Sequence, residues 1–249
     1  MDFYHLGWKR IESKKKRMRN LLKIALPDEA LYREIMLSLG YKNNSLSFLE
    51  LATLLPYSEI RKLNKREVIE RAMLFRAGFI DDRSDIPGYF DFSLRMMSSV
   101  WTYKETRPAN FPEKRISQVS YLLAQTIEHG IYAFFKKRVE AGLTDGINGQ
   151  NVKAKVNTII SFGGLGVSRK LDMFFNILVP FYLVIFEDEG KVLEKKQLER
   201  VVEIFPVTKG NKKIIERIAR KYPEERIKIE SMIEYFGLLE FEKNKNLST

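Results

Sequence analysis

The sequence predicts an all-α protein, a multi-helix domain. Two observations carry this prediction: apolar residues recur at the three- and four-residue spacing of helices along most of the chain, and Pro, Gly and capping residues separate the periodic segments. The 249 residues, of which 45% are hydrophobic and 30% charged, suffice for a globular protein with a buried core. We expect either one domain over 1–249 or two helical lobes, 1–103 and 112–249, joined by the 104–111 loop.

The sequence pattern predicts five helices in the first half of the chain. In the first, residues 9–26, the apolar side chains share one face and Pro27 ends the run. Asn64 and Glu67 have the spacing of a capping box at the start of another helix, which Gly78 ends. The remaining three are expected at 27–39, 46–55 and, after an acidic loop at 79–90, at 91–103.

The second half begins with the longest helical pattern, from Pro112 to Gly142, in which Gly130 is a candidate bend. A Gly- and Asn-rich loop follows at 143–151. The pattern of 152–162 is compatible with either a strand or a helix. Four further helices are expected at 168–186, with a kink at Pro180, and at 191–205, 211–221 and 224–240.

Several classes of chemistry find no support in the composition. The chain has no Cys and only two His, His5 and His129, which excludes disulfides and thiolate metal sites and argues against a histidine-based centre. The acidic groups at 81–85 and 187–189 lack the spacing of a calcium loop. No serine has a nucleophile-elbow context. We therefore predict no metal site, no cofactor and a non-catalytic protein.

The chain shows no segment for membrane insertion or export. The most apolar stretch, 173–186, is interrupted by Asn176 and Pro180 and is shorter than the roughly 20 residues of a spanning helix. The first residues lack the apolar core of a secretory signal. We expect a cytoplasmic location. Abundant Lys, Glu, Arg and Ile resemble the composition of thermophile proteins.

Positive charge is the unusual bulk property, with a formal net charge of +11. Eight basic residues and one acid between positions 9 and 23 give that helix a local charge of +7. Such a surface suits phosphate backbones, acidic proteins or anionic membranes, whereas a merely solvated basic face is the alternative. The candidate anion-binding residues are Lys9, Arg10, Lys14, Lys15, Lys16, Arg17, Arg19 and Lys23. We expect Lys14–Arg17 to avoid the apolar face and to be dispensable for folding.

A second candidate is the glycine-rich segment 161–170, which precedes a helix expected to start at Ser168. Backbone amides at a helix start, together with nearby cations, can hold a phosphate. The order of residues does not match a P-loop, and a tight connection between helices is the alternative. The residues of this possible phosphate loop are Gly163, Gly164, Gly166, Arg169 and Lys170.

The most distinctive segment is 104–118. Pro108 and Pro112 stiffen it and present Arg107 and Asn110 on a rigid loop. A polar line continues along the next helix and includes Arg115, Gln118, Gln125 and His129. This is either a binding surface or a packed connection in which Arg107 satisfies backbone carbonyls or carboxylates.

At RPANFPEKRI (107–116) the chain resembles a bacterial family of uncharacterised proteins, domain of unknown function 2851. The residues that carry the resemblance are Arg107, Pro108, Asn110, Pro112, Arg115, Gln118 and, in NILVPF, Asn176. A looser similarity includes Asn211. The family's full-length relatives imply an earlier restriction-endonuclease-like domain and a Cys-rich tail, both of which we expect to be missing here. The resemblance thus implies the helical half of a possible nuclease-like protein.

These observations leave three functional hypotheses. The first is a nucleic-acid-associated module that binds DNA or RNA and is related to a nuclease-like partner. The second is a protein-interaction or scaffold subunit whose basic face meets an acidic partner. The third and weakest is an enzyme that binds a phosphorylated ligand at 163–170. The sequence does not indicate the oligomeric state.

Overall fold

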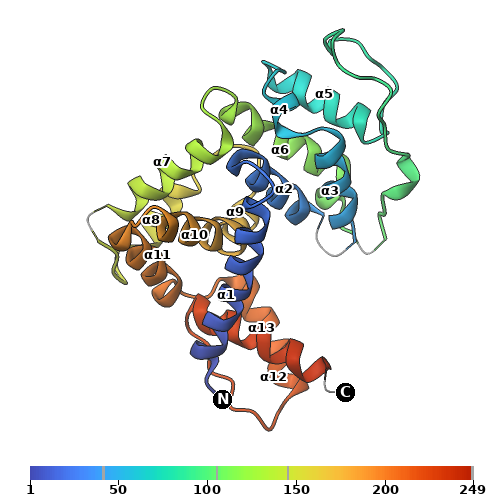
Figure 1. Cartoon of the computed structure of the whole chain (residues 1–249). Coiled ribbons are helices and arrows are strands. Elements are labelled where there is room, and N and C mark those ends of the chain that lie inside the picture. Colours follow the sequence, from blue (N-terminus) through green and yellow to red (C-terminus); the bar gives the residue numbers. More distant parts are fainter. Residues whose placement is uncertain (41–42, 105, 145, 248–249) are drawn as a thin grey trace. The chain divides into compact units, whose positions relative to one another are not determined.

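The computed structural model describes residues 1–40, 43–104, 106–144 and 146–247, and it confirms the all-α fold (Figure 1). Over those residues the only β-type pairing is an isolated antiparallel bridge between Pro206 and Ser231. The chain forms two compact units, each assembled from segments distant in sequence. Unit 1 comprises Met1–Lys23, Lys137–Ile160 and Phe174–Thr249, and unit 2 comprises Ile24–Lys136 and Ser161–Met173. The lobes expected on either side of 104–111 stay a prediction.

Unit 2 contains the helices of the first half of the chain other than α1, together with α9, and most begin where the sequence signals predict. α2 has Pro27 at its first position and two acids in its first turn, which complement the helix dipole. The core contains fully buried aromatic side chains such as Tyr32, Phe48 and Phe75. The helices are α2 (Pro27–Leu39), α3 (Ser45–Leu54), α4 (Tyr57–Ile60), α5 (Arg66–Arg76), α6 (Pro112–Thr126), the first part of α7 (Ile131–Leu143) and α9 (Val167–Met173).

The long helix expected from 112 to 142 is broken rather than bent. Gly130 has a φ of +86°, which separates α6 from α7. The carboxylate of Asp28 occupies the space beside this glycine, because a Cβ there would lie 2.7 Å from Asp28 Oδ2. The same carboxylate accepts a hydrogen bond of 2.8 Å from the backbone N–H of Tyr132. It thereby satisfies one of the free amides at the start of α7.

The helix expected at 91–103 is absent; only a short 3₁₀ turn, Ser98–Val100, forms there. Contacts with the end of α5 hold this segment in an extended form. The backbone carbonyl of Arg76 accepts from Met96 N at 2.8 Å, and Trp101 Nε1 donates to the carbonyl of Ala77 at 2.8 Å. These tertiary contacts override the local helical pattern. The capping box expected from Asn64 is also wrong, because α5 begins at Arg66 without a side-chain cap.

Unit 1 contains α1 (Phe3–Leu22), the second part of α7, α8 (Val152–Ile159), α10 (Val179–Asp188), α11 (Val192–Ile204), α12 (Lys209–Lys221) and α13 (Met232–Leu247). The ambiguous segment 152–162 is therefore mostly helical. The expected helix 224–240 begins later, at Met232, because residues 223–225 form a turn and Ser231 forms the isolated bridge with Pro206. Beside this bridge the Glu230 carbonyl accepts a hydrogen bond of 3.0 Å from Val207 N.

The expected helix 168–186 is divided by a π-helical turn, Phe174–Leu178, that separates α9 from α10. Pro180 lies in the first turn of α10, where its missing N–H costs least. The irregularity thus precedes the proline instead of being a kink at it. α10 is buried along most of its length, and no helix in the described ranges is long and apolar enough to cross a membrane.

α1 and α13 pack closely through two glycines. A Cβ on Gly7 would lie 2.0 Å from the carbonyl oxygen of Ile233, and one on Gly237 would lie 1.8 Å from that of Phe3. Edge-on contact between the rings of Phe3 and Phe241, 6.0 Å apart, adds to this packing. The two backbones therefore approach to a distance that no other residue permits.

We predict that Gly237→Ala lowers the free energy of unfolding by about 1–3 kcal/mol, because the new methyl group overpacks the contact with Phe3. The direction of the change in unfolding free energy distinguishes overpacking from helix propensity, because Ala at an exposed helical position stabilises by up to about 1 kcal/mol relative to Gly. The control is Gly210→Ala in α12, where the nearest atom is an ordinary 3.7 Å away. Urea denaturation of both variants checks this, and equal stabilities would contradict it.

Candidate nucleic-acid interface on helix α1

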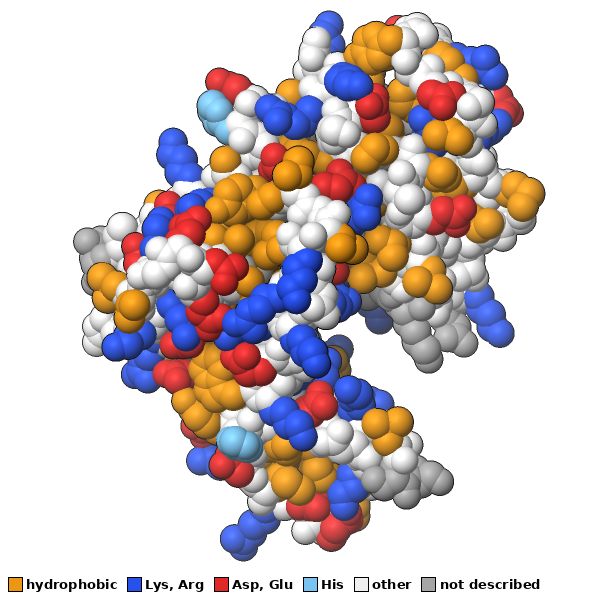
Figure 2. All heavy atoms as spheres, in the orientation of Figure 1, with side chains coloured by type: hydrophobic (Ala, Val, Ile, Leu, Met, Phe, Trp, Pro, Cys, Tyr) orange, Lys and Arg blue, Asp and Glu red, His pale blue; other side chains and the backbone are white. Residues whose placement is uncertain are grey.

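Helix α1 presents a line of exposed lysines on the side opposite its buried face. Its buried residues are Phe3, Gly7, Ile11, Lys15 and Met18. Lys9, Lys16 and the C-cap residue Lys23 repeat every seven residues, about 10.5 Å apart along the axis, and are all exposed. Among the described residues these three lysines, here called the outer stripe, form no ion pair. Figure 2 shows Lys and Arg side chains gathered over the part of the face where Figure 1 places α1.

Other cations of α1 point toward the rest of unit 1. Arg10 forms an ion pair of 3.1 Å with Glu240 of α13. Lys14 donates to Asn176 Oδ1 and lies 4.5 Å from the ring centroid of Phe236. Asn176 belongs to the π-helical turn, a feature that often occurs at functional sites. The exposed Arg17 completes the set of predicted residues.

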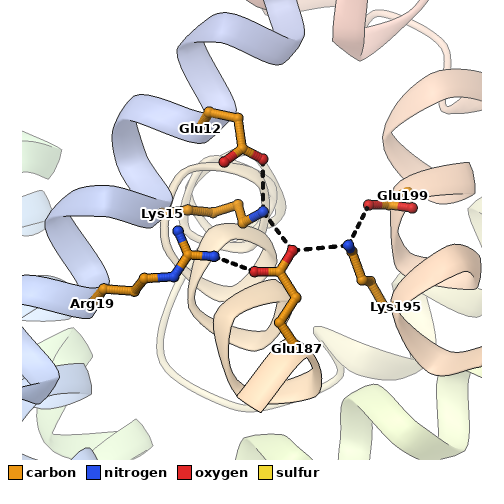
Figure 3. A network of polar contacts seen from close by, with 6 residues as sticks. All are labelled: Glu12, Lys15, Arg19, Glu187, Lys195 and Glu199. Atoms are coloured by element: carbon orange, nitrogen blue, oxygen red, sulfur yellow. Dashed lines mark hydrogen bonds and ion pairs between the residues drawn. The ribbon is translucent and has the colours of Figure 1, made fainter. Parts of the chain in front are cut away.

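Lys15 is buried, contrary to the expectation that 14–17 avoid the packed face. Its side chain is only 4% exposed, and its ammonium donates to Glu12 and to Glu187, each at 2.6 Å. Figure 3 shows these residues converging with Arg19, Lys195 and Glu199 from α1, α10 and α11. Glu187 also pairs with Arg19 and, at 2.9 Å, with Lys195. We call these six residues the Glu187 cluster.

Contacts within the Glu187 cluster shift the pKa values of Glu187, Lys195 and Glu199. Burial disfavours the Glu187 carboxylate, but hydrogen bonds from Lys15 and Lys195 outweigh burial and hold the pKa of Glu187 below its usual value. The hydrogen bond to Glu187 raises the pKa of Lys195. Glu199, by contrast, has a pKa raised by burial. The central carboxylate therefore remains charged at neutral pH and anchors the inner side of α1.

In unit 2 the residues of the RPANFP segment meet around Arg115. Its buried guanidinium donates to Gln118 Oε1 at 2.7 Å and to Asn110 Oδ1. Burial lowers the pKa of Arg115, and the opposing attraction of Asp172 raises it less. Pro108 and Pro112 start the 3₁₀ turn and α6 that bring Asn110 back toward this side chain.

Arg107 does not make the contacts with carbonyls or carboxylates that the packed-connection alternative assigned to it. Its side chain is exposed and makes no hydrogen bond or ion pair within the described residues, while Arg115 takes that role. The polar residues predicted to continue the line beyond Arg115 do not form one group with it. Gln125 is exposed and donates to the Tyr121 carbonyl at 2.7 Å, and the exposed His129 lies 3.6 Å from Glu128.

The glycine-rich segment also makes close contacts within unit 2. Gly164 has a φ of +90°, and a Cβ there would lie 2.1 Å from the carbonyl oxygen of Gln118. Arg169 is buried and donates to the Ser38 carbonyl at 3.2 Å, and burial lowers its pKa to about 10. Lys170 donates to the Phe162 carbonyl. These contacts favour the tight connection; the phosphate loop at Gly163, Gly164 and Gly166 stays a prediction.

α12 carries a second basic surface that was not among the sites predicted from the sequence. The signal was present, since the segment 209–221 contains six basic residues and one acid. No group of three or more His, Cys, Asp and Glu side chains suited to a metal ion occurs in the described ranges.

Residues 3–147 match the family described as "Protein of unknown function (DUF2851)", which is more than half of the 249 residues. The chain belongs to this family. The matched DUF2851 range includes the RPANFP segment and all of the basic helix α1. Asn176 and Asn211 lie beyond it, so their similarity to the family stays a prediction. No curated protein and no solved structure matches the chain.

We predict that Glu187→Gln lowers the free energy of unfolding by about 2–4 kcal/mol at pH 7, because it removes the main counter-charge of the buried Lys15. The lowered pKa of Glu187 sets the pH dependence: its contribution is present above the usual value of 4.5 and is lost as the pH falls through the lowered value. The difference between variant and wild type should therefore vanish in acid.

Urea denaturation at pH 7, 5 and 3 measures this difference. The control is Glu194→Gln on α11, a half-buried carboxylate that forms no ion pair within the described residues. We expect its effect to stay within about 0.5 kcal/mol. A Glu187 effect that is the same at all three pH values would rule out the ion-pair explanation.

We predict that Arg115→Ala lowers the free energy of unfolding by about 1.5–3 kcal/mol, because it removes charged hydrogen bonds to Asn110 and Gln118. Arg107→Ala, eight positions earlier on the exposed loop, serves as the matched control and should leave the melting temperature unchanged. Thermal unfolding followed by circular dichroism compares the two. A larger loss in the Arg107 variant would reverse the assignment.

Proposed function

We propose that this chain is a non-catalytic helical module that binds the phosphate backbone of DNA or RNA with little sequence preference. The observation that carries the proposal is the outer stripe, in which Lys9, Lys16 and Lys23 lie exposed and without ion pairs in the described part of the chain. Their side chains stabilise nothing visible in unit 1. Three lysines in a row on a rigid helix suit a polyanion, because each can neutralise one phosphate.

The packing of α1 supports this proposal by making the stripe rigid. The inner side of the helix is held by the Glu187 cluster and by the close contact with α13. A rigid platform lets its cations contact a partner without the cost of ordering the backbone. In the same proposal, the module accompanies a nuclease-like domain, as the resemblance at 107–116 implies.

We predict that changing Lys9, Lys16 and Lys23 together to Gln flattens the dependence of log affinity on log salt. Each lost phosphate contact on B-DNA removes about 0.9 from the slope, so the expected loss is about 2.7. Fluorescence anisotropy with a labelled duplex of mixed sequence, titrated at several salt concentrations, measures it. Lys15 is left unchanged, because its substitution would disturb the fold.

The matched control removes the same charge from unit 2. Lys65, Lys104 and Lys114 are exposed and form no ion pair in the described ranges. Their joint change to Gln should leave the slope within about 1 of the wild-type value, since a distributed net charge contributes less than direct contacts. If the wild-type chain does not bind DNA or RNA even at low salt, the proposal fails. The acidic-partner hypothesis then becomes the better explanation of the stripe.

A further inference from the structure

α12 divides its residues sharply between an apolar and a cationic side. Ile218 is fully buried and packs, with the partly buried Ile214 and Ile215, into a cluster that contains Phe3 and Phe241. The opposite side is solvent-exposed. It carries Lys209, Lys212, Lys213, Arg217, Arg220 and Lys221, with Glu216 as the one acid of this helix.

Most of these cations have no counter-charge in unit 1. Arg217 pairs with Glu242 at 2.9 Å, and Lys221 donates to Asn246 at 2.6 Å. Lys209, Lys212, Lys213 and Arg220 form no ion pair within the residues that the structure describes. This is the reverse of α1, where several cations are neutralised by acids of neighbouring helices.

The position of the lysines along α12 is unfavourable for the helix itself. Three of them lie in its first two turns, and its first turn contains no acid. The positive end of the helix dipole repels cations there. The capping box between Thr208 and Asn211, with hydrogen bonds of 3.3 and 2.9 Å, offsets part of this cost. The fold alone thus gives no reason for this arrangement, whereas an external anion does.

The packing of the apolar side of α12 indicates which kind of anion this helix can bind. A basic amphipathic helix that binds membranes inserts its apolar side chains into the lipid. In α12 these side chains are already packed against α1 and α13, which leaves charge as the means of contact. Lys209, Lys213 and Arg220 lie along one side of α12, at steps of about 6 and about 10.5 Å along the axis, a row that can follow a chain of phosphates.

We infer that α12 is a second surface for nucleic-acid phosphates, on the same compact unit as the outer stripe of α1. This inference deepens the proposed function and rests on it. It names duplex or single-stranded nucleic acid as the partner of α12 and adds phosphate contacts beyond those of α1. Lys209, Lys212, Lys213 and Arg220 are the contacting residues.

The test changes Lys209, Lys212, Lys213 and Arg220 together to Gln and repeats the salt titration with the labelled duplex. The loss of four contacts should reduce the slope by about 3.6. The control is the Gln variant of Lys65, Lys104, Lys114 and Lys153, all exposed. Because the substitutions relieve repulsion at the helix start, the melting temperature should not fall. A lower melting temperature would mean that the lysines serve the fold, against the inference.

Comparison with the α1 variant separates the possible failures. If the α1 change flattens the slope and the α12 change does not, the inference is wrong and the proposed function stands. If only the α12 change does so, the α1 interface is wrong and the inference stands. If the wild-type protein binds no nucleic acid, both the proposed function and the inference about α12 are wrong. Binding to phosphatidylserine vesicles that the α12 change abolishes, with duplex binding unaltered, would replace the inference with a membrane surface.

Discussion

The ion pair between Lys15 and Glu187 is the constraint on which the arrangement of unit 1 depends. A helix with a local charge of +7 can pack along one side only if acids from other helices accept its inward cations. Glu187, at the end of α10, meets Lys15 and Arg19 of α1 and Lys195 of α11. One carboxylate thereby fixes three helices. The glycine contacts between α1 and α13 set the remaining side of the helix.

This division gives the charges of α1 two different physical roles. The inward cations compensate acids and contribute to stability, so their removal should be measured in unfolding. The outward lysines lie in solvent, where isolated charges contribute little to stability. Only the second group is available to a partner. The net charge of +11 therefore overstates the number of cations that α1 offers to a partner, and the outer stripe is the group that remains.

Local signals predicted much of the fold, and long-range contacts explain what they missed. Proline and glycine punctuation located α2 and α3 to within a residue or two. The helix expected at 91–103 failed because Arg76 and Ala77 hold that segment extended. The burial of Lys15 was equally hidden, since its partner is 172 residues away. The contacts of Arg115 with Asn110 and Gln118 span only a few residues, and all three were among the residues singled out from the sequence. Which of the two arginines would be buried was not predictable from spacing, because it depends on how the loop packs on α6.

The two basic helices differ in a way that bears on function. On α1 the sequence exaggerates the available charge, because neighbouring acids neutralise part of it. On α12 the sequence pattern is simpler, since the apolar side is in the core and most cations lack counter-charges in the described part of unit 1. Natural helices tend to place acids, not lysines, in their first turn. An arrangement that costs the helix stability and satisfies no internal group is explained most simply by a partner that supplies the missing negative charge.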